Sequence, residues 1–270
     1  MRRGGQHVAV VFDIQSGLAS GLGMVRAGIL PRMIRAAERF ALNRVDHVVV
    51  ISDKMKEALL ALGVRTTIDV IPIWVDETKI FPLPCADRAT STLLYSGNLG
   101  RKQGLDQILD LAEVLADRRP DVRFLIRGNG SQDSEIRRLA SERSLANLEF
   151  QSLVPAEKLN EGLADGDIHL VPQIPDGADF AVPSKVYNIM AAGRPFICTA
   201  TSGSPLEVLS RQAEGSICVP PNDPQAFADA VISLLDDPQR RSRMGRNGRR
   251  YVETEMARDA VMQRYAALIQ

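Results

Sequence analysis

Four stretches of the chain place glycine, amide and basic side chains directly after short apolar runs. Backbone amides, arginine and lysine bind phosphate oxygens, whereas acid–base catalysis needs carboxylates or histidine. If the apolar runs are neighbouring parallel strands, the loops that follow them meet at the sheet edge where open α/β sheets bind ligands. These residue types therefore favour a diphosphate ligand. The four stretches are YSGNLGRKQG (95–104), IRGNGSQD (126–133), QSLVPAEKL (151–159) and DFAVPSKVYNIMAAGRP (179–195).

The last stretch has the signals of a helix with a sharp start and end. Pro183 is tolerated in a first helical turn, Ser184 can cap free amides, and Gly193 ends the helix two residues before another proline. A helix start presents unpaired N–H groups and a partial positive charge, to which Lys185 adds a full one. The segment predicts a phosphate site at Ser184 and Lys185, with an ordinary capped helix as the alternative.

The stretch 95–104 is a glycine-rich turn between a strand and a helix. Its glycines permit close approach of a ligand to the backbone, and its Arg-Lys pair offers charge to a phosphate. The turn matches neither the dinucleotide-binding fingerprint nor the P-loop, so the Arg-Lys pair carries the functional interpretation. The candidates are Gly97, Asn98, Arg101 and Lys102.

Two further turns complete the predicted edge. Asn129 lies in a Gly-Asn-Gly turn after a buried strand, for which a plain turn is the alternative. Arg127 ends that strand, and a charge at the end of a central strand usually has a partner. The Val154 turn precedes a helix, where its backbone could bond a base edge, although an ordinary loop explains it as well.

Two groups of residues with metal-binding character are better explained as structural. Asp165 and Asp167 resemble the Asp-x-Asp of metal-dependent transferases, but they precede a predicted strand and so lie at the wrong end of the sheet for a ligand. His7, His47 and His169 each begin a predicted strand without metal-ligand spacing. We expect no metal site.

Strand-like and helix-like segments alternate along almost the whole chain. Continuous apolar strands separated by amphipathic helices predict parallel sheets covered on both faces, which is an α/β fold. The expected strands are 7–12, 47–52, 67–73, 92–97, 122–128, 148–154, 168–173 and 195–200. The expected helices are 24–44, 53–62, 104–117, 132–144, 155–165, 184–192, 204–213, 224–236 and one long helix near 239–269.

A proline-rich, aperiodic stretch divides the chain. Residues 1–75 hold too few elements for a doubly wound domain and predict a partial α/β domain, and 76–91 form the linker. Residues 92–238 predict one complete Rossmann-like domain with a parallel sheet. We expect residues 239–270 to form a helical region that packs back toward the N-terminal part.

Composition narrows the classes of partner and compartment. Lysine plus arginine and aspartate plus glutamate both number 33, so bulk charge gives no indication of a nucleic acid partner. The three cysteines, Cys85, Cys198 and Cys218, are widely spaced and predict no disulfide framework. With no secretory signal and no apolar run long enough for a bilayer, we expect a cytoplasmic protein.

In their order along the chain, these motifs resemble those of GT-B glycosyltransferases. The subgroup with the strongest resemblance is family 4, among bacterial polysaccharide-assembly enzymes similar to the colanic acid transferases. The resemblance extends over nearly the whole chain, although the first domain of the family is mostly absent. It rests on LLYSGNLGRKQGLDQILDLAE, FLIRGNG, SLVPAEKL, VPSKVYNIMAAGRP and GSICVPPNDPQAFADAVISLLDDP, and on HVVVISDKMKEALLALGV and VIPIWVDETKIFPLP before them.

The resemblance implies a retaining, metal-independent hexosyltransferase that uses a UDP- or GDP-sugar as substrate and needs no further cofactor. Its acceptor would be a glycan or a lipid-linked glycan. In this resemblance, one group of residues faces the diphosphate, a second lies near the nucleotide, and Asn188 stands where many members bond the ribose. The diphosphate group is Gly97, Asn98, Arg101, Lys102, Ser184 and Lys185, and the nucleotide group is Arg127, Asn129 and Val154.

Two departures from the family pattern limit what the resemblance implies. Many members carry a Glu-x7-Glu pair, where this chain has Phe180 and Asn188. Asparagine can still bond a hydroxyl, but phenylalanine cannot replace a carboxylate contact to the sugar. The chain also has only the end of the family's first domain, so one alternative is a nucleotide-sugar-binding module or split subunit that needs a partner domain. A GT-B epimerase is another alternative, although we find no carboxylates and histidines placed for it.

The segment 24–44 combines an apolar face with a row of arginines. Such a helix can lie on an anionic membrane surface, which would suit a lipid-linked acceptor, whereas a solvated helix face is the alternative. We therefore keep peripheral contact with the inner face of the membrane as a hypothesis. The apolar face is Leu30, Met33, Ile34, Ala37, Phe40 and Ala41, and the basic face is Arg32, Arg35 and Arg39.

Overall fold

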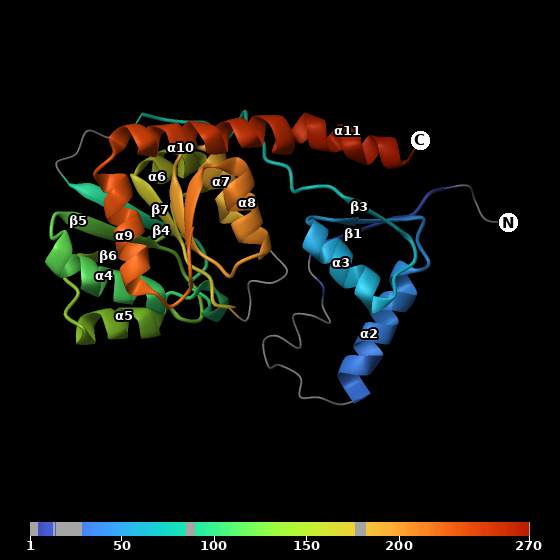
Figure 1. The fold of residues 1–270 in the computed structure, drawn as a ribbon, viewed down its shortest axis with the longest axis horizontal. Helices are drawn as coiled ribbons and strands as arrows, with labels where there is room; N and C mark the ends of the chain where they lie inside the picture. The colour runs from blue at the N-terminus through green and yellow to red at the C-terminus, as the bar shows by residue number, and fades with distance from the viewer. Residues whose placement is uncertain (1–4, 13, 15–28, 85–89, 176–181, 270) are drawn as a thin grey trace.

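The computed structural model describes residues 5–12, 14, 29–84, 90–175 and 182–269, and Figure 1 shows two α/β units joined by an extended linker and by the C-terminal helices. One sheet has three strands and the other six, and all strand pairs within them are parallel. The alternation predicted from the sequence is therefore confirmed as an α/β fold.

The small sheet has the order β1-β2-β3, with β1 (Val8–Val11), β2 (His47–Val50) and β3 (Thr67–Val70). Helices α2 (Ile29–Leu42) and α3 (Asp53–Leu62) lie on one face, where Met55 and Leu59 pack with Val48. On the other face Val261 of α11 (Arg258–Leu268) packs with Val49, so the C-terminal helix returns to the N-terminal unit.

The large sheet has the order β6-β5-β4-β7-β8-β9. Its first strand in the chain lies in the middle, so the winding direction reverses between β4 and β7, and the loops after these two strands flank a topological switch point. The strands are β4 (Ser91–Ser96), β5 (Val122–Arg127), β6 (Leu148–Gln151), β7 (Ile168–Val171), β8 (Phe196–Thr199) and β9 (Ser216–Val219).

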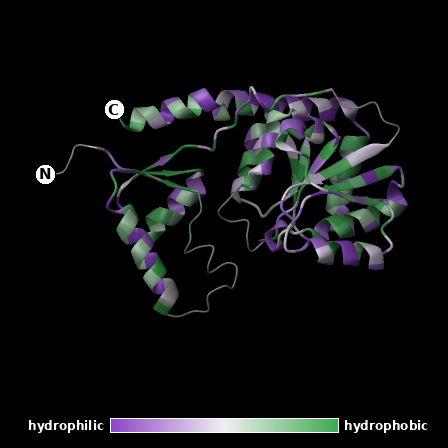
Figure 2. Ribbon diagram, turned by 180° about the vertical axis from the view of Figure 1, so that it is seen from behind, coloured by the Kyte–Doolittle hydropathy of each residue, from purple (hydrophilic) through white to green (hydrophobic). Residues whose placement is uncertain are grey.

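Helices cover both faces of this sheet, and Figure 2 shows its hydrophobic strands enclosed between them. One face packs on α4 (Asp106–Arg118), α5 (Asp133–Glu142) and α9 (Pro224–Leu235), which bury Phe124 and Ile197 among other side chains. The other packs on α6 (Leu159–Ala164), α7 (Lys185–Ala191) and α8 (Pro205–Ala213) around Phe196. Short 3-10 turns, η1 (Arg101–Gln103) and η2 (Ala156–Lys158), lie in two of the loops.

The C-terminal segment is not the single helix expected from the sequence. Helix α10 (Pro238–Tyr251) continues into a π-helical turn (Val252–Met256), and Ala257 then adopts an extended conformation before α11 begins. Arg249 anchors α10 by donating hydrogen bonds to the carbonyl oxygens of Ile80 and Ala191, at 2.7 and 2.8 Å. The break lets α10 pack on the large sheet's unit and α11 on the small one (Figure 1).

The sequence also left one strand unpredicted. β9 lies at the edge of the large sheet, where Ser216, Ile217 and Cys218 are half-buried. Because it is short and begins with serine, it lacks the apolar run by which the other strands were identified. Among the described residues, no helix combines the length and apolar character that crossing a membrane requires.

Candidate functional site

Three of the four predicted stretches follow β4, β5 and β7 at the carboxyl edge of the large sheet, and the fourth, 151–159, follows β6 at the end of the strand order. The loop after β4 and the start of α7, which follows β7, flank the switch point, and the loop after β5 lies beside them. The loops predicted to face the diphosphate therefore lie at one edge of the sheet.

The loops after β4 and β5 are hydrogen-bonded to one another. The amide of Gly97 donates to the carbonyl of Arg127 at 2.9 Å, and the amide of Leu99 donates to the carbonyl of Asn129 at 2.8 Å. Gly130 has a φ of +158°, and a Cβ there would lie 2.5 Å from the Leu99 carbonyl oxygen. Only glycine fits this contact, and the two turns form one platform.

Four of the predicted diphosphate and nucleotide residues lie exposed on this platform. Arg101 and Lys102 form the short turn η1, and neither side chain has a hydrogen bond or ion pair to another described residue. Asn98 and Asn129 are exposed at the tips of the two loops. The platform thus presents two unneutralised cations and two amides to solvent.

Lys185 is the most unusual side chain of the site. Its Nζ atom is shielded from solvent and, among the described residues, has no hydrogen-bond partner, although the residue as a whole is only half-buried. Nζ lies 3.7 Å from the centroid of the Tyr95 ring and would lie 3.5 Å from a Cβ at Gly97. Burial lowers the pKa of Lys185 to about 7. A buried ammonium without a hydrogen bond is costly, so the structure holds a strong unused donor at the switch point.

Tyr95 supports this lysine, and the sequence did not single it out. It is fully buried at the end of β4, and its hydroxyl donates to the carbonyl of Asn98 at 2.6 Å. Burial raises its pKa, so the phenol stays neutral. Only its position directly before the glycine-rich turn could have indicated a role at the site, because a buried aromatic residue in a strand is typical of the hydrophobic core.

The prediction that Ser184 caps the α7 helix is wrong. Its hydroxyl makes no capping hydrogen bond, and its backbone already has helical angles, with φ −56° and ψ −26°. The Ser184 side chain is exposed, so it remains available to a ligand. Asn188 lies one turn after Lys185 and is half-buried, whereas Phe180 falls outside the described residues.

The Arg127 side chain makes its hydrogen bonds within the protein. The guanidinium is buried and donates to Gln151 Oε1 at 3.0 Å, to the Gly162 carbonyl at 3.0 Å and to Asp165 Oδ2 at 2.7 Å. Its donors therefore brace α6 against β5 and β6. Val154 packs below Gly162, where an added Cβ would lie 2.6 Å from a Val154 methyl group.

The acidic pair, His47 and His169 have structural partners as well, and His47 Nδ1 lies 3.0 Å from Asp69 Oδ2. Asp165 binds Arg127, and Asp167 accepts a hydrogen bond from the Thr92 amide at 2.8 Å. Burial lowers the pKa of His169 to about 4, and its Nε2 lies 3.0 Å from the Leu163 carbonyl oxygen. No three histidine, cysteine, aspartate or glutamate side chains in the described parts of the chain gather as metal ligands would.

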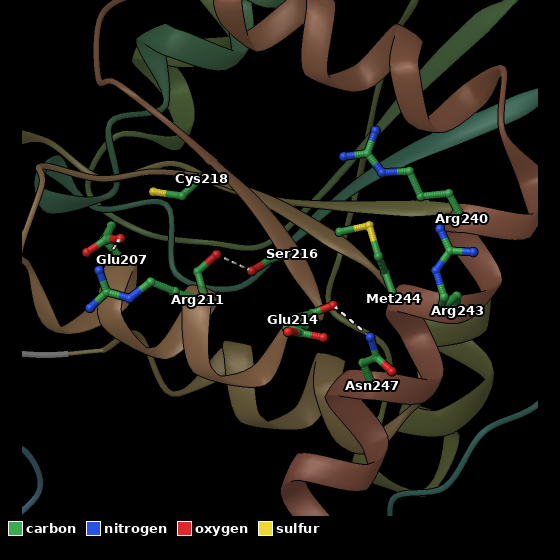
Figure 3. A pocket seen from close by; sticks show the side chains of 10 residues that line it. Glu207, Arg211, Glu214, Ser216, Cys218, Arg240, Arg243, Met244 and Asn247 are labelled. Carbon is green, nitrogen blue, oxygen red and sulfur yellow. Dashed lines mark hydrogen bonds and ion pairs between the residues drawn. The ribbon is translucent and has the colours of Figure 1, made fainter.

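Two hollows are lined by residues outside the platform. One, of about 240 Å³, lies between the two units, beside Asp53 of α3 and Tyr187 of α7. The other, of about 430 Å³, lies between α8, β9 and α10, and Figure 3 shows the charged side chains that line it.

Comparison with protein families shows the family to which this chain belongs. The family described as "Glycosyl transferases group 1" matches residues 85–251, which include the platform and Lys185. The chain belongs to the group 1 glycosyltransferases. A second family, "Glycosyl transferase 4-like domain", matches residues 1–74, the part that carries the small sheet.

Curated relatives of this glycosyltransferase agree with the family. WcaI of Escherichia coli, whose name assigns it to colanic acid biosynthesis, is 28% identical over 94% of this chain and 64% of its own length. A GDP-mannose-dependent phosphatidylinositol monomannoside mannosyltransferase of Corynebacterium glutamicum is 29% identical over 84% of this chain and 63% of its own. The chain thus spans less than two thirds of the length of these relatives.

Solved structures show that the fold is GT-B. A sucrose-phosphate synthase from Thermosynechococcus elongatus superposes with a TM-score of 0.76 at 22% identity, over 97% of this chain and 66% of that one. Anabaena HepE in complex with UDP and glucose gives a TM-score of 0.78 at 15% identity, over 96% and 70%.

Proposed function

We propose that this glycosyltransferase transfers a hexose from a UDP- or GDP-sugar to a glycan or lipid-linked acceptor in polysaccharide biosynthesis. The observation that carries the proposal is Lys185, a shielded lysine without a hydrogen bond among the described residues, placed at the switch point beside Gly97. A donor diphosphate supplies the oxygens that this ammonium lacks.

The rest of the platform fits the same ligand. Arg101 and Lys102 add two exposed cations, and the exposed Ser184 hydroxyl lies next to Lys185. In this arrangement Asn129 and Val154 lie near the nucleotide, and Asn188 bonds the ribose. Arg127, which the sequence placed beside the nucleotide, acts instead by holding β5 and α6 in position.

The catalytic contribution of these residues is electrostatic. Fixed cations that face the leaving diphosphate stabilise the charge that develops as the glycosidic bond breaks. Holding donor and acceptor in one geometry lowers the barrier further. We propose that transfer needs no bound metal, because these cations can neutralise the diphosphate. Retention of configuration is proposed from the resemblance to the GT-B family alone.

A thermal-shift panel with UDP, GDP, ADP and their sugar conjugates tests this function. A ligand at about a hundred times its Kd stabilises a native site by about 2.7 kcal/mol. For a chain of this size that is a rise in Tm of about 5–10 °C. A selective rise with one nucleotide supports the proposal and identifies the base. No rise with any of them, from protein shown to be folded, would overturn it.

A second candidate is a donor-binding subunit that requires a partner for transfer. The exposed apolar surface of the small unit supports this candidate. Met33 and Phe40 of α2 are 62% and 60% exposed, and Phe12 after β1 is 54% exposed. Apolar surface of this kind marks a contact with another protein or with a membrane. Of the predicted apolar face of α2, the described side chains of Met33, Ala37, Phe40 and Ala41 are exposed, and that of Ile34 is half-buried.

An experiment can distinguish a membrane from a protein partner as the occupant of this surface. Peripheral binding at the cytoplasmic face of a membrane predicts co-sedimentation with anionic vesicles, which Met33→Gln with Phe40→Gln abolishes and high salt weakens. A protein partner predicts no vesicle binding, and donor binding without transfer until that partner is added.

A further inference from the structure

Two of the three cysteines face each other across the edge of the large sheet. Cys198 on β8 and Cys218 on β9 are register partners in a parallel ladder, so their side chains project from the same face. Both pack in the cluster that holds α7 and α8. The sequence separates them by nineteen intervening residues, and nothing in the glycosyltransferase reaction uses them.

The two thiols differ in their access to solvent. Cys198 is fully buried, whereas Cys218 is half-buried and lines the hollow of about 430 Å³ between α8, β9 and α10. Figure 3 shows Cys218 at one side of this hollow, on the same side as Glu207 and Arg211 of α8. A small polar molecule that enters the hollow therefore meets Cys218 first.

The two thiols also have different neighbours: the Cys198 thiol donates to the Ile217 carbonyl at 3.7 Å and the Cys218 thiol to the Ala200 carbonyl at 4.0 Å. The Cys198 thiol lowers the pKa of Cys218, against opposing effects of burial and of Glu207. The same pairing, together with burial, raises the pKa of Cys198. Because Cys218 is also the more accessible thiol, it takes the attacking role, and the buried Cys198 takes the resolving role.

We propose that Cys198 and Cys218 form an oxidisable dithiol site, in which a hydroperoxide that enters this hollow converts the pair to a disulfide. The Cys218 thiolate attacks the outer peroxide oxygen, the O–O bond breaks, and the departing oxide takes a proton from water to leave as an alcohol or water. The sulfur of Cys198 then attacks the Cys218 sulfenic acid, the S–O bond breaks, and the Cys198 proton leaves with the hydroxyl as water. Two thiols lose two electrons, and the peroxide gains them.

The geometry of the ladder permits this bond. Neighbouring strands lie about 4.7–4.9 Å apart, and disulfides join Cα atoms about 4.4–6.8 Å apart. Among the described residues, β9 is the last strand in the order of the sheet and pairs with β8.

The test uses the full chain with Cys85→Ser, so that the thiols of Cys198 and Cys218 are the two that remain. Equimolar hydrogen peroxide is expected to remove both remaining thiols, with a mass loss of two hydrogens and a Cys198–Cys218 cross-linked peptide that dithiothreitol cleaves. Adding Cys198→Ser leaves a sulfenic acid at Cys218 that dimedone traps. Adding Cys218→Ser, or Cys218→Ala if the serine variant is unfolded, slows oxidation of Cys198 by about tenfold or more.

Three results would contradict the proposed dithiol site. Persistence of both thiols in folded protein would overturn the site, as would oxidation of Cys198 at an unchanged rate without Cys218. Overoxidation of Cys218 with no cross-linked peptide would overturn the resolving step. None of these measurements depends on donor binding, so their outcome tests this inference independently of the proposed function.

Discussion

Lys185 Nζ lies 3.7 Å from the centroid of the Tyr95 ring, which joins the first residue of α7 to the end of β4 across the switch point. The ring face attracts the ammonium but offers it no hydrogen bond. A nearby diphosphate can satisfy that ammonium without moving it far. In the proposed function, the pair connects a core residue of the sheet with the donor diphosphate.

Donor affinity is expected to weaken as the pH rises above about 7. Burial holds the pKa of Lys185 near 7 in the free protein, and a bound diphosphate favours the charged form, so binding raises that pKa and takes up a proton. By linkage, each pH unit above 7 then lowers the affinity by about tenfold until the pKa of the complex is reached. Calorimetry with a nucleotide-sugar in two buffers of different ionisation enthalpy counts the protons. An affinity that is flat with pH, or proton release, would contradict this.

Gly130→Ala is expected to destabilise the protein by about 1–3 kcal/mol, because its Cβ would overlap the Leu99 carbonyl in a strained conformation. Since the β4 loop must move, nucleotide affinity falls with stability. Gly203→Ala is the matched control: its φ is +74° but no atom lies within 4 Å, so only strain of about 1–2 kcal/mol applies and affinity is kept. Urea unfolding and calorimetry report both quantities. Equal loss of affinity in the two variants would refute the interlocked platform.

Arg127→Met distinguishes a structural brace from a nucleotide contact. Removing the guanidinium leaves Asp165 and the Gly162 carbonyl without this partner. We expect a loss of roughly 2–3 kcal/mol in unfolding free energy, less than for a fully buried pair because Asp165 is 31% exposed. The Kd for nucleotide, measured where the variant is folded, changes less than about threefold. A large rise in Kd with unchanged stability would show instead that Arg127 meets the ligand.

The order of elements was predictable because the chain is locally regular. Eight strands were identified as short apolar runs, and only β9 lacked that signal. The sequence predicted one long C-terminal helix, because no glycine or proline indicates the break at Ala257. Its cause is tertiary: α10 and α11 pack on different units.

At the site, the sequence identified the loops better than the role of each side chain. Arg101, Lys102 and Lys185 do lie at the switch point, since parallel strands bring their loops together. That Arg127 turns away toward Asp165 depends on α6, which the sequence could not place relative to β5. The capping role predicted for Ser184 failed for a local reason, because the residue already has helical backbone angles.

The most direct test of the central claim is calorimetry of Lys185→Met with UDP, GDP and the corresponding nucleosides. Methionine can fill the buried site without a charge, so the variant is expected to fold at least as stably as the parent. Its affinity for the preferred nucleoside diphosphate should fall by about 10–100-fold, and its affinity for the nucleoside should not change. Lys79→Met serves as control, because Lys79 is 80% exposed and pairs with Asp76 in the linker. A folded parent protein that binds no nucleoside diphosphate, or a Lys185→Met variant that binds it as tightly as the parent, would contradict the account.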